Sequence, residues 1–415
     1  MSLPLRSLPI VEHWDCHSCA RCCRGSIIPL TQEDLAKIVS QRWHEQPEFR
    51  GSRIVVRRSL ANRQLILAKR PDGACVFLMD DGRCRIHLEH GLEAKPIVCQ
   101  TYPLQLVPHD TAAYFTLRRS CPSAAAGRGR AATLDRPDIR RLLQRQQDKL
   151  QPRAVPPVTA RIRLPWKTTG RVLQTLGRLM TDSHYPIVRR VVHALLVCDA
   201  LEQCDPRRLE ERQYGELLSM LADSALEEAS PFFRDRTPPA RSTLGLFRQS
   251  VFHFLRLHPC AKLRETWRDR LALTTGAWRF LRGRGVIPRL GTAAAPATFE
   301  SLEEPLGPLD PRIMEPLNLF LETSAASSRY VLLRPSGWNV VDGFRSLALT
   351  YAAGMWLARF FSHEAELTRD AMVDIVVALD RGQGFEPLTG SRHRHRIRGL
   401  SRPGQLAGLV AWYAR

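Results

Sequence analysis

Residues 14–25 of this 415-residue chain read WDCHSCARCCRG and carry four cysteines within eight positions. These are Cys16, Cys19, Cys22 and Cys23, in a Cys-x-x-Cys-x-x-Cys-Cys spacing. A thiolate is a soft anionic ligand that suits Zn²⁺ or an iron–sulfur cluster, and a two-residue spacing lets successive sulfur atoms converge from one tight turn. The motif therefore predicts a metal centre around which the first part of the chain folds.

Four further cysteines belong to the same part of the chain. Eight of the eleven cysteines lie in the first 121 residues, and those outside the motif are Cys75, Cys84, Cys99 and Cys121. We predict all eight as metal ligands. They could form two four-coordinate sites, or one iron–sulfur cluster with four thiols left over, and ligand softness does not separate zinc from iron. Because adjacent side chains of an extended segment point apart, one of the two neighbouring thiols at 22 and 23 could serve a different centre.

The other cysteines and the nearby histidines have simpler interpretations. We expect thiols of the protein core in the apolar helical patterns of the later chain, at Cys198, Cys204 and Cys260. We expect three histidines at the surface or around the ligands rather than on the ion, namely His13, His17 and His87. The sequence identifies no catalytic residue and no residue that contacts an organic cofactor.

The composition favours metal ligation over disulfide formation. A chain of this length can bury an ample core without disulfides. The N-terminal sequence MSLPLRSLPIVEHW has no long apolar run or small-residue cleavage site, and no uncharged apolar stretch reaches the ~18 residues needed to cross a bilayer. We therefore expect a cytoplasmic protein without a membrane span. In a reducing cytosol, closely spaced cysteines bind metal or do redox work more often than they form disulfides.

The formal net charge of +20 raises the question of an anionic partner. The excess is nearly all arginine and is spread along the chain, with local density at residues 124–147 and 391–405. It does not form one stripe interleaved with aromatic residues, so we disfavour nucleic acid as a partner. An acidic protein surface would suit the charge equally well.

Short helices and strands are predicted for residues 1–123. Thr31-x-x-Asp34 before an apolar run predicts a capping box that opens a helix. The segments RIVVRR (53–58) and QLILAK (64–69) predict two strands. This part of the chain is therefore expected to be a compact α+β domain.

A predicted hairpin poses a problem for the ligand set. Asp81-Gly82 supplies the positive φ values of a tight turn, which predicts two short strands within residues 74–87. In an ideal hairpin, Cys75 and Cys84 would lie ~13 Å apart along one face, too far for a single ion. Either the strand is shorter or bent near Cys75, or the two thiols serve different centres.

The rest of the chain is predicted to be mainly helical. Apolar residues recur at steps of three and four within 172–179, 187–195 and 246–255, and two more helices are predicted at 342–361 and 368–380. A further helix is expected to start at Asp205-Pro206, a cap followed by proline. The fold class is thus an α+β N-terminal cysteine-cluster domain followed by a mainly α-helical region.

Proline-, glycine- and arginine-rich stretches predict the domain boundaries. They divide the chain into a cysteine-cluster metal-binding domain (1–123), an Arg/Pro-rich linker (124–159), a helical domain (160–290), a second linker (291–310), a C-terminal helical subdomain (311–390) and a basic tail (391–415). We expect the basic tail to be mobile.

Several short motifs accompany the cysteines. They are LTQED (30–34), CVFL (75–78), GRCRI (82–86) and PIVCQTYP (96–103). In combination they resemble the bacterial cysteine-cluster family described as zinc- or iron-chelating (CxxCxxCC). Within that family, LRRSCP (117–122) resembles the flagellin lysine-N-methylases.

The resemblance covers residues 13–123 and implies a domain that binds an iron–sulfur cluster or Zn²⁺. The methylase branch further implies S-adenosylmethionine as a cofactor and a flagellin-like protein as substrate. Residues 311–387 are similar only in outline to the helical C-terminal region of that branch.

Two classes of function follow. The first is an enzyme, a protein-lysine N-methyltransferase that uses S-adenosylmethionine. The Gly-Arg-Gly sequences at 127–129 and 283–285 lack the flanking strand and helix of a nucleotide-binding fold, and we expect the aromatic candidates Tyr102, Trp338 and Tyr351 to be core residues. The cysteine spacing also differs from the C-x3-C-x2-C of radical enzymes. The alternative is a non-enzymatic module for metal binding, redox chemistry or protein interaction.

Overall fold

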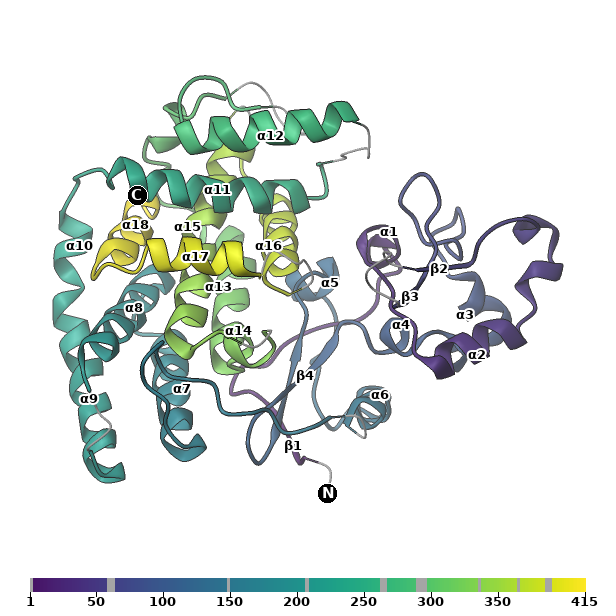
Figure 1. The fold of residues 1–415 in the computed structure, drawn as a ribbon, viewed down its shortest axis with the longest axis horizontal. Coiled ribbons are helices and arrows are strands. Elements are labelled where there is room, and N and C mark those ends of the chain that lie inside the picture. The colour runs from purple at the N-terminus through teal and green to yellow at the C-terminus, as the bar shows by residue number, and fades with distance from the viewer. Residues whose placement is uncertain are drawn as a thin grey trace.

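The computed structural model of the chain has two parts of different architecture (Figure 1). It describes residues 3–57, 64–147, 150–205, 209–261, 267–288, 297–334, 337–363, 366–384 and 390–415. A small part with short strands and short helices lies on one side, and a larger body of helices lies on the other (Figure 1). The predicted fold class, α+β followed by mainly α-helical, is confirmed.

We call residues 21–101, which form the small part, the cysteine lobe. Its elements are α1 (Arg21–Gly25), α2 (Gln32–Ser40), β2 (Val55–Arg57), β3 (Leu65–Leu67), α3 (Arg85–His90) and α4 (Ile97–Thr101), with 3-10 turns at Trp43–Glu45, Pro47–Phe49 and Leu92–Ala94. Both predicted strands are present, and β2 pairs antiparallel with β3 so that Val56 lies opposite Ile66.

The predicted capping box opens α2. The Thr31 hydroxyl accepts the Asp34 N–H at 3.1 Å, and the Asp34 carboxylate accepts the Thr31 N–H at 3.0 Å. These two bonds satisfy amide groups that the first helical turn leaves without partners. Asp34 also accepts the N–H of Ile97 at 2.9 Å, which joins the start of α2 to α4.

The hairpin predicted around Asp81-Gly82 forms only in part. Gly82 adopts a positive φ of 83°, and a single antiparallel bridge pairs Leu78 with Cys84. Before that bridge the chain turns, because the Leu78 N–H donates to the carbonyl oxygen of Cys75 at 3.0 Å. The first arm is therefore bent near Cys75, and the separation of an ideal hairpin does not apply to Cys75 and Cys84.

A three-stranded sheet stands between the cysteine lobe and the helices. Its order is β1 (Leu5–Arg6), β5 (Ala113–Leu117) and β4 (Leu104–Pro108), with β1 parallel and β4 antiparallel to the central strand. Two helices follow, α5 (Pro122–Ala125) and α6 (Pro137–Gln147). Ile139 and Leu143 of α6 pack in one core with Leu104 and Leu106. The segment predicted as a linker therefore contains a packed helix.

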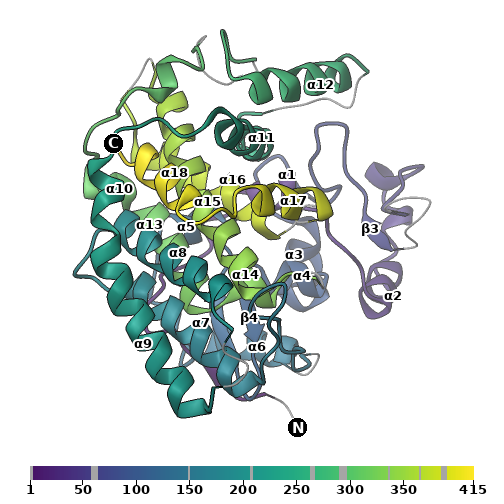
Figure 2. The same ribbon diagram turned by 60° about the vertical axis from the view of Figure 1, so that its left-hand side comes forward.

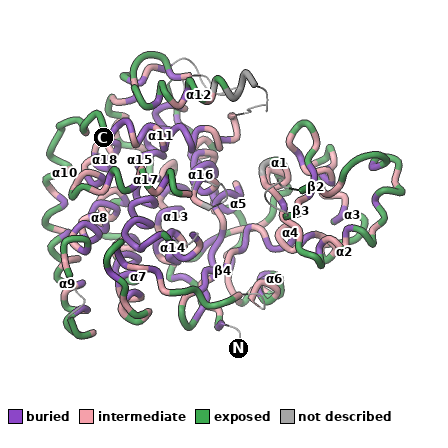
Figure 3. Tube along the Cα trace, viewed as in Figure 1, coloured by how far each residue is buried: buried purple, intermediate pink, exposed green. Residues whose placement is uncertain are grey.

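The larger body is built around α15, whose residues are almost all buried (Figure 3). Its helices are α7 (Trp166–Thr181), α8 (Ile187–Gln203), α9 (Glu211–Glu228), α10 (Ser230–Arg234), α11 (Arg241–Leu257), α12 (Trp267–Arg282), α13 (Pro311–Ala326), α14 (Arg329–Leu332), α15 (Val340–Phe361) and α16 (Arg369–Gly384), with a 3-10 turn at Ser301–Glu303. The five helices predicted from apolar periodicity are all present. In the part of the chain that the structure describes, no helix is long and apolar enough to span a bilayer.

One prediction about the C-terminal part is wrong, and one predicted helix start lies outside the described residues. Helix α9 begins at Glu211, where Glu210 and Gln213 form a capping box, whereas the start predicted at Asp205-Pro206 involves residues 206–208, which lie outside the described residues. The basic tail is not a free segment, because it forms α17 (Ser391–Gly399) and α18 (Gln405–Tyr413). Helix α18 packs between α8 and α15 (Figures 1 and 2), and Tyr413 is fully buried. Residues 291–296 of the predicted second linker lie outside the described residues.

Buried histidines make the stability of the helical body depend on pH. His253 of α11 is 6% exposed, and neither of its ring nitrogens has a hydrogen-bond partner among the described residues. Burial, together with Arg256 and Arg396, lowers its pKa to about 3. The same cause lowers the pKa of His193 and of His258 to about 4.

We expect His253→Phe to reduce the loss of stability in acid. In the folded state His253 stays neutral, whereas in the unfolded chain it takes up a proton below about pH 6.5. Its contribution is therefore complete above that pH and falls by roughly 2 kcal/mol between pH 8 and pH 5. Chemical denaturation at both pH values should show a smaller difference for His253→Phe than for the wild type. His44→Asn, at an exposed position, is the matched control. Equal losses in all three proteins would contradict this assignment.

Candidate metal centre

The eight predicted ligands come from separate segments of the chain. Cys16 and Cys19 are exposed and precede α1, and Cys22 and Cys23 lie within α1. The others stand at a turn, at the start of α3, within α4 and at the start of α5; they are Cys75, Cys84, Cys99 and Cys121.

Five of these thiols gather in the cysteine lobe, and we call them the thiol cluster: Cys22, Cys23, Cys75, Cys84 and Cys99. The sulfur atoms of Cys22 and Cys23 are 3.9 Å apart. The Cys75 N–H donates to the carbonyl oxygen of Cys23 at 2.8 Å, so α1 is bonded directly to the turn that carries Cys75. The charges of Cys75 and Cys84 both act on Cys99. Cys75, Cys84 and Cys99 also pack against one apolar core, so segments up to 77 positions apart in the sequence (22 to 99) lie near one another.

Cys22 and Cys23 do not lie in an extended segment. Residues 21–25 are helical, and the two sulfur atoms face one another closely enough to interact. The expectation that Cys22 and Cys23 point apart is therefore wrong, because it assumed an extended backbone. Ala20 precedes the helix with a positive φ of 56°, which turns the chain sharply after Cys19.

The thiols of the cluster differ in their pKa values: that of Cys22 is lowered, whereas those of Cys23, Cys75 and Cys99 are raised. The hydrogen bond from Cys23, together with the Lys95 ammonium, lowers the pKa of Cys22 to about 6 although burial opposes ionisation. The same hydrogen bond raises the pKa of Cys23, as do burial and the charges of Cys22, Cys75 and Cys99. Burial raises the pKa of Cys75 to about 11 and also raises that of Cys99. Without a cation, the cluster can therefore hold little negative charge, and a bound cation would favour several thiolates at once.

Cys121 lies apart from the thiol cluster. Burial raises its pKa to about 11, partly offset by the amides of Ala124 and Ser123. Cys19 and Cys22 act on it electrostatically, so the charge of one member of the thiol cluster, Cys22, reaches Cys121. The position of Cys121 is therefore compatible with two separate metal centres. It is equally compatible with one metal centre at the thiol cluster that leaves Cys121 without metal.

Closed coordination is not present in the described ranges. There, no three Cys, His, Asp or Glu side chains are arranged as ligands of one ion. The donor chemistry of the thiol cluster fits Zn²⁺ or iron, since it is made of thiols alone. The assignment of individual cysteines as ligands therefore stays a prediction.

The other candidates are exposed or buried largely as the sequence predicts, although Cys204 and Cys260, which were expected in the core, are only partly buried. His13 and His17 are exposed, and Nδ1 of His17 is 3.1 Å from the Ser123 hydroxyl. His87 has a lowered pKa because of partial burial and the nearby Lys95. Cys198 is a fully buried core thiol in α8. Tyr351 and Trp338 are buried as predicted.

Sequence reasoning missed the polar groups that surround the thiols. Lys95 acts on Cys22, Cys99 and His87. Two aspartates of α16, Asp374 and Asp380, contact the cysteine-bearing segments from the helical body. No local pattern in the sequence could have identified these aspartates, because the contacts join residues more than 250 positions apart.

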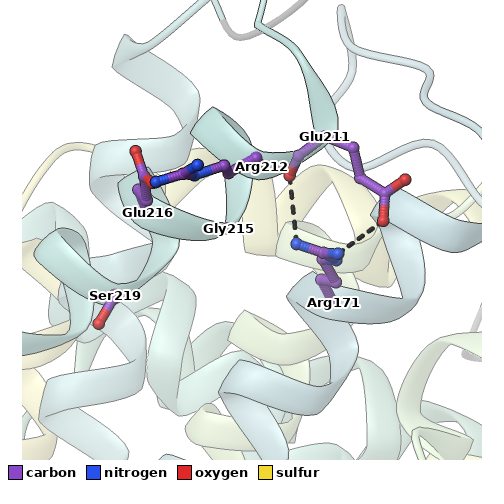
Figure 4. A pocket seen from close by; sticks show the side chains of 6 residues that line it. All are labelled: Arg171, Glu211, Arg212, Gly215, Glu216 and Ser219. Carbon is purple, nitrogen blue, oxygen red and sulfur yellow. Dashed lines mark hydrogen bonds and ion pairs between the residues drawn. The ribbon is translucent and has the colours of Figure 1, made fainter.

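Two hollows of the described structure are lined by residues other than cysteine. One, of about 630 Å³, lies between α7 and α9 (Figure 4). Its charged residues form ion pairs with each other, Arg171 with Glu211 and Arg212 with Glu216. Ser219 adds a hydroxyl group to the lining. The other, of about 480 Å³, lies on the cysteine lobe over residues 76–81. These linings carry no constellation for catalysis.

A family model that matches part of the chain describes a metal-chelating domain, which agrees with the chemistry of the thiols. No curated protein and no solved structure matches the chain. The family model matches residues 15–122, a range that contains all eight N-terminal cysteines. In this range the chain is therefore similar to the CxxCxxCC family, described as a "Putative zinc- or iron-chelating domain".

Proposed function

We propose that the protein binds zinc or iron through the thiol cluster. The observations that carry the proposal are the contact between the Cys22 and Cys23 sulfur atoms, the hydrogen bond from Cys75 to Cys23, and the packing of Cys75, Cys84 and Cys99 against one core. Cysteines that are merely core residues have no reason to gather. The low pKa of Cys22 adds support, because ligation requires thiolates.

The metal would supply different chemistry according to its identity. Zinc held by four thiolates is closed and structural, whereas an iron–sulfur cluster can also transfer electrons. In either case, the chain's contribution is to bury the thiols beside Lys95 and to limit the access of water. The exposed thiols of Cys16 and Cys19 are the ones that an incoming ion would meet first.

Elemental analysis with visible absorption spectroscopy tests this proposal. We expect protein purified without oxygen to contain iron with sulfide and a broad band near ~400 nm, or one to two zinc ions per chain without colour. Loss of the metal should follow treatment with a strong chelator. Protein that contains neither metal, and binds neither when it is supplied to the reduced chain, would overturn the proposal.

A narrower proposal rests on the sequence motifs alone: the protein transfers methyl groups from S-adenosylmethionine to lysines of a flagellin-like protein. Its support is the resemblance of residues 117–122 to the methylase branch. Incubation of metal-loaded protein with labelled S-adenosylmethionine and flagellin should label the flagellin. Metal-loaded protein that labels nothing would favour the non-enzymatic module for metal binding, redox chemistry or protein interaction.

A further inference from the structure

Helix α16 of the helical body contacts two segments that carry cysteines. One is α1, with Cys22 and Cys23, and the other is the Ser120–Cys121 turn. The first contact is an ion pair between Arg21 of α1 and Asp374. Arg21 immediately precedes Cys22 and is 39% exposed, while Asp374 is 21% exposed. In Figure 1, α16 lies on the side of the helical body that is turned toward α1. The pair therefore ties the helix that carries Cys22 and Cys23 to the larger part of the protein.

The second contact holds the segment that carries Cys121. The Asp380 carboxylate is 3% exposed and accepts the Ser120 N–H at 2.7 Å. Its other oxygen accepts from Arg329 at 2.6 Å. Burial alone would raise the pKa of Asp380, but Arg329, Arg118 and the Ser120 hydrogen bonds outweigh it and the pKa lies below its usual value. A carboxylate that remains charged in the core thus fixes the backbone next to Cys121.

The same helix brings a third charge to this junction. Arg381 interacts electrostatically with Asp374, Asp380 and Arg21, and with Tyr102. The Tyr102 hydroxyl donates to the Ser120 hydroxyl at 3.2 Å, so Ser120, the neighbour of Cys121, is hydrogen-bonded both to α16 and to Tyr102. A network of this kind restrains backbone positions more strongly than apolar contacts do, since each bond has a direction.

We infer that Asp374 and Asp380 are positioning residues of the metal centre, although they belong to the helical body and lie far outside residues 15–122. They hold α1 and the Ser120–Cys121 turn in place, so the thiols of Cys22 and Cys121 are ordered before metal arrives. The inference rests on the proposed metal binding. Residues around metal ligands commonly change metal affinity by 10- to 100-fold when they are replaced.

The full-length chain is the right material for the test, with Asp374→Asn and Asp380→Asn as the variants. Asp370→Asn is the matched control, because it lies on the same helix and pairs with Arg128, at a site where the two side chains are 77% and 57% exposed. Affinity is measured by titration with Co²⁺ against a competing chelator, followed by the thiolate-to-cobalt charge-transfer band. We expect about 10-fold weaker binding for both variants and a weaker band at saturation. Asp370→Asn should bind like the wild type.

Two further measurements separate positioning from general destabilisation. Asp374→Glu keeps the carboxylate beside the flexible Arg21 and should restore affinity to near the wild-type value. The melting temperature of the metal-free protein should change little in Asp374→Asn, since that pair is partly exposed. If Asp380→Asn does not fold, the Asp374 pair of variants decides the question.

The possible failures are distinct. Wild-type affinity and band intensity in Asp374→Asn and Asp380→Asn would overturn the inference while leaving metal binding intact. Weaker binding that Asp374→Glu does not restore would also overturn it, because the carboxylate would then not be the active feature. A wild-type protein that binds no cobalt or zinc would remove the proposed function and this inference with it.

Discussion

Arg119→Met is expected to destabilise the folded protein by about 3–5 kcal/mol. Arg119 follows β5 and is fully buried, and its guanidinium contacts the carboxylate of Glu12, which is 4% exposed, at 2.6 Å. Burial disfavours both charges: it raises the pKa of Glu12 and lowers the pKa of Arg119, and the mutual attraction offsets part of that cost. Removal of the cation leaves an uncompensated carboxylate in the core.

The effect should be measured by chemical denaturation near neutral pH. Arg128→Met is the control, because Arg128 and its partner Asp370 are both exposed and such pairs contribute up to about 1 kcal/mol. The double variant Glu12→Leu with Arg119→Met should recover much of the loss, since no buried charge remains. An Arg119→Met protein as stable as the wild type would show that this pair does not hold the N-terminal segment to β5.

Local signals in the sequence predicted much of the fold. The capping box at Thr31 and Asp34 and the strands β2 and β3 are set by neighbouring residues, and all are present. The long helices α7, α8, α11, α15 and α16 follow from apolar periodicity, which tertiary packing reinforces. Helices, strands and caps that depend on a few neighbouring residues could therefore be predicted from the sequence.

Features that depend on distant contacts were not predicted. The basic residues of α17 gave a polar pattern typical of a solvated tail, yet the segment packs through buried His393 and Ile397. Gly404 donates to Asp199 of α8 at 2.7 Å, a contact across 205 positions. Strands β4 and β5 were also missed, although β5 is the central strand of the sheet. Their stability comes from the core shared with α6, which no local pattern contains.

The candidate metal centre likewise has features that neighbouring residues predict and features that depend on distant contacts. The close spacing from Cys16 to Cys23 identified the thiols, but not which of them meet. The bend at Cys75 allows Cys75 and Cys84 to approach, whereas the backbone beside Cys121 is fixed by the hydrogen bond from Ser120 to Asp380. Cysteine spacing therefore indicated the chemistry of the ligands, and the fold of the surrounding segments determined their grouping.

Cys22→Ser is expected to reduce bound metal sharply and to lower the stability of the metal-loaded protein by roughly 4 kcal/mol. Cys22 belongs to the thiol cluster and also acts electrostatically on Cys121, and its pKa of about 6 favours the thiolate at neutral pH. A hydroxyl remains protonated and is a poor ligand for a soft metal. Cys99→Ser, in the buried wall of the cluster, should have a similar effect.

Metal content per chain and denaturation with and without chelator measure both effects. Cys204→Ser at the end of α8 is the control, because that thiol is outside the cysteine lobe and should leave the metal content unchanged. After removal of the metal, the wild type and Cys22→Ser should differ far less in stability, since most of the loss comes from ligation. Full metal retention in both Cys22→Ser and Cys99→Ser would contradict the thiol cluster as the binding site. Metal loss in Cys16→Ser and Cys19→Ser as well would indicate that the exposed segment closes onto the cluster when metal binds.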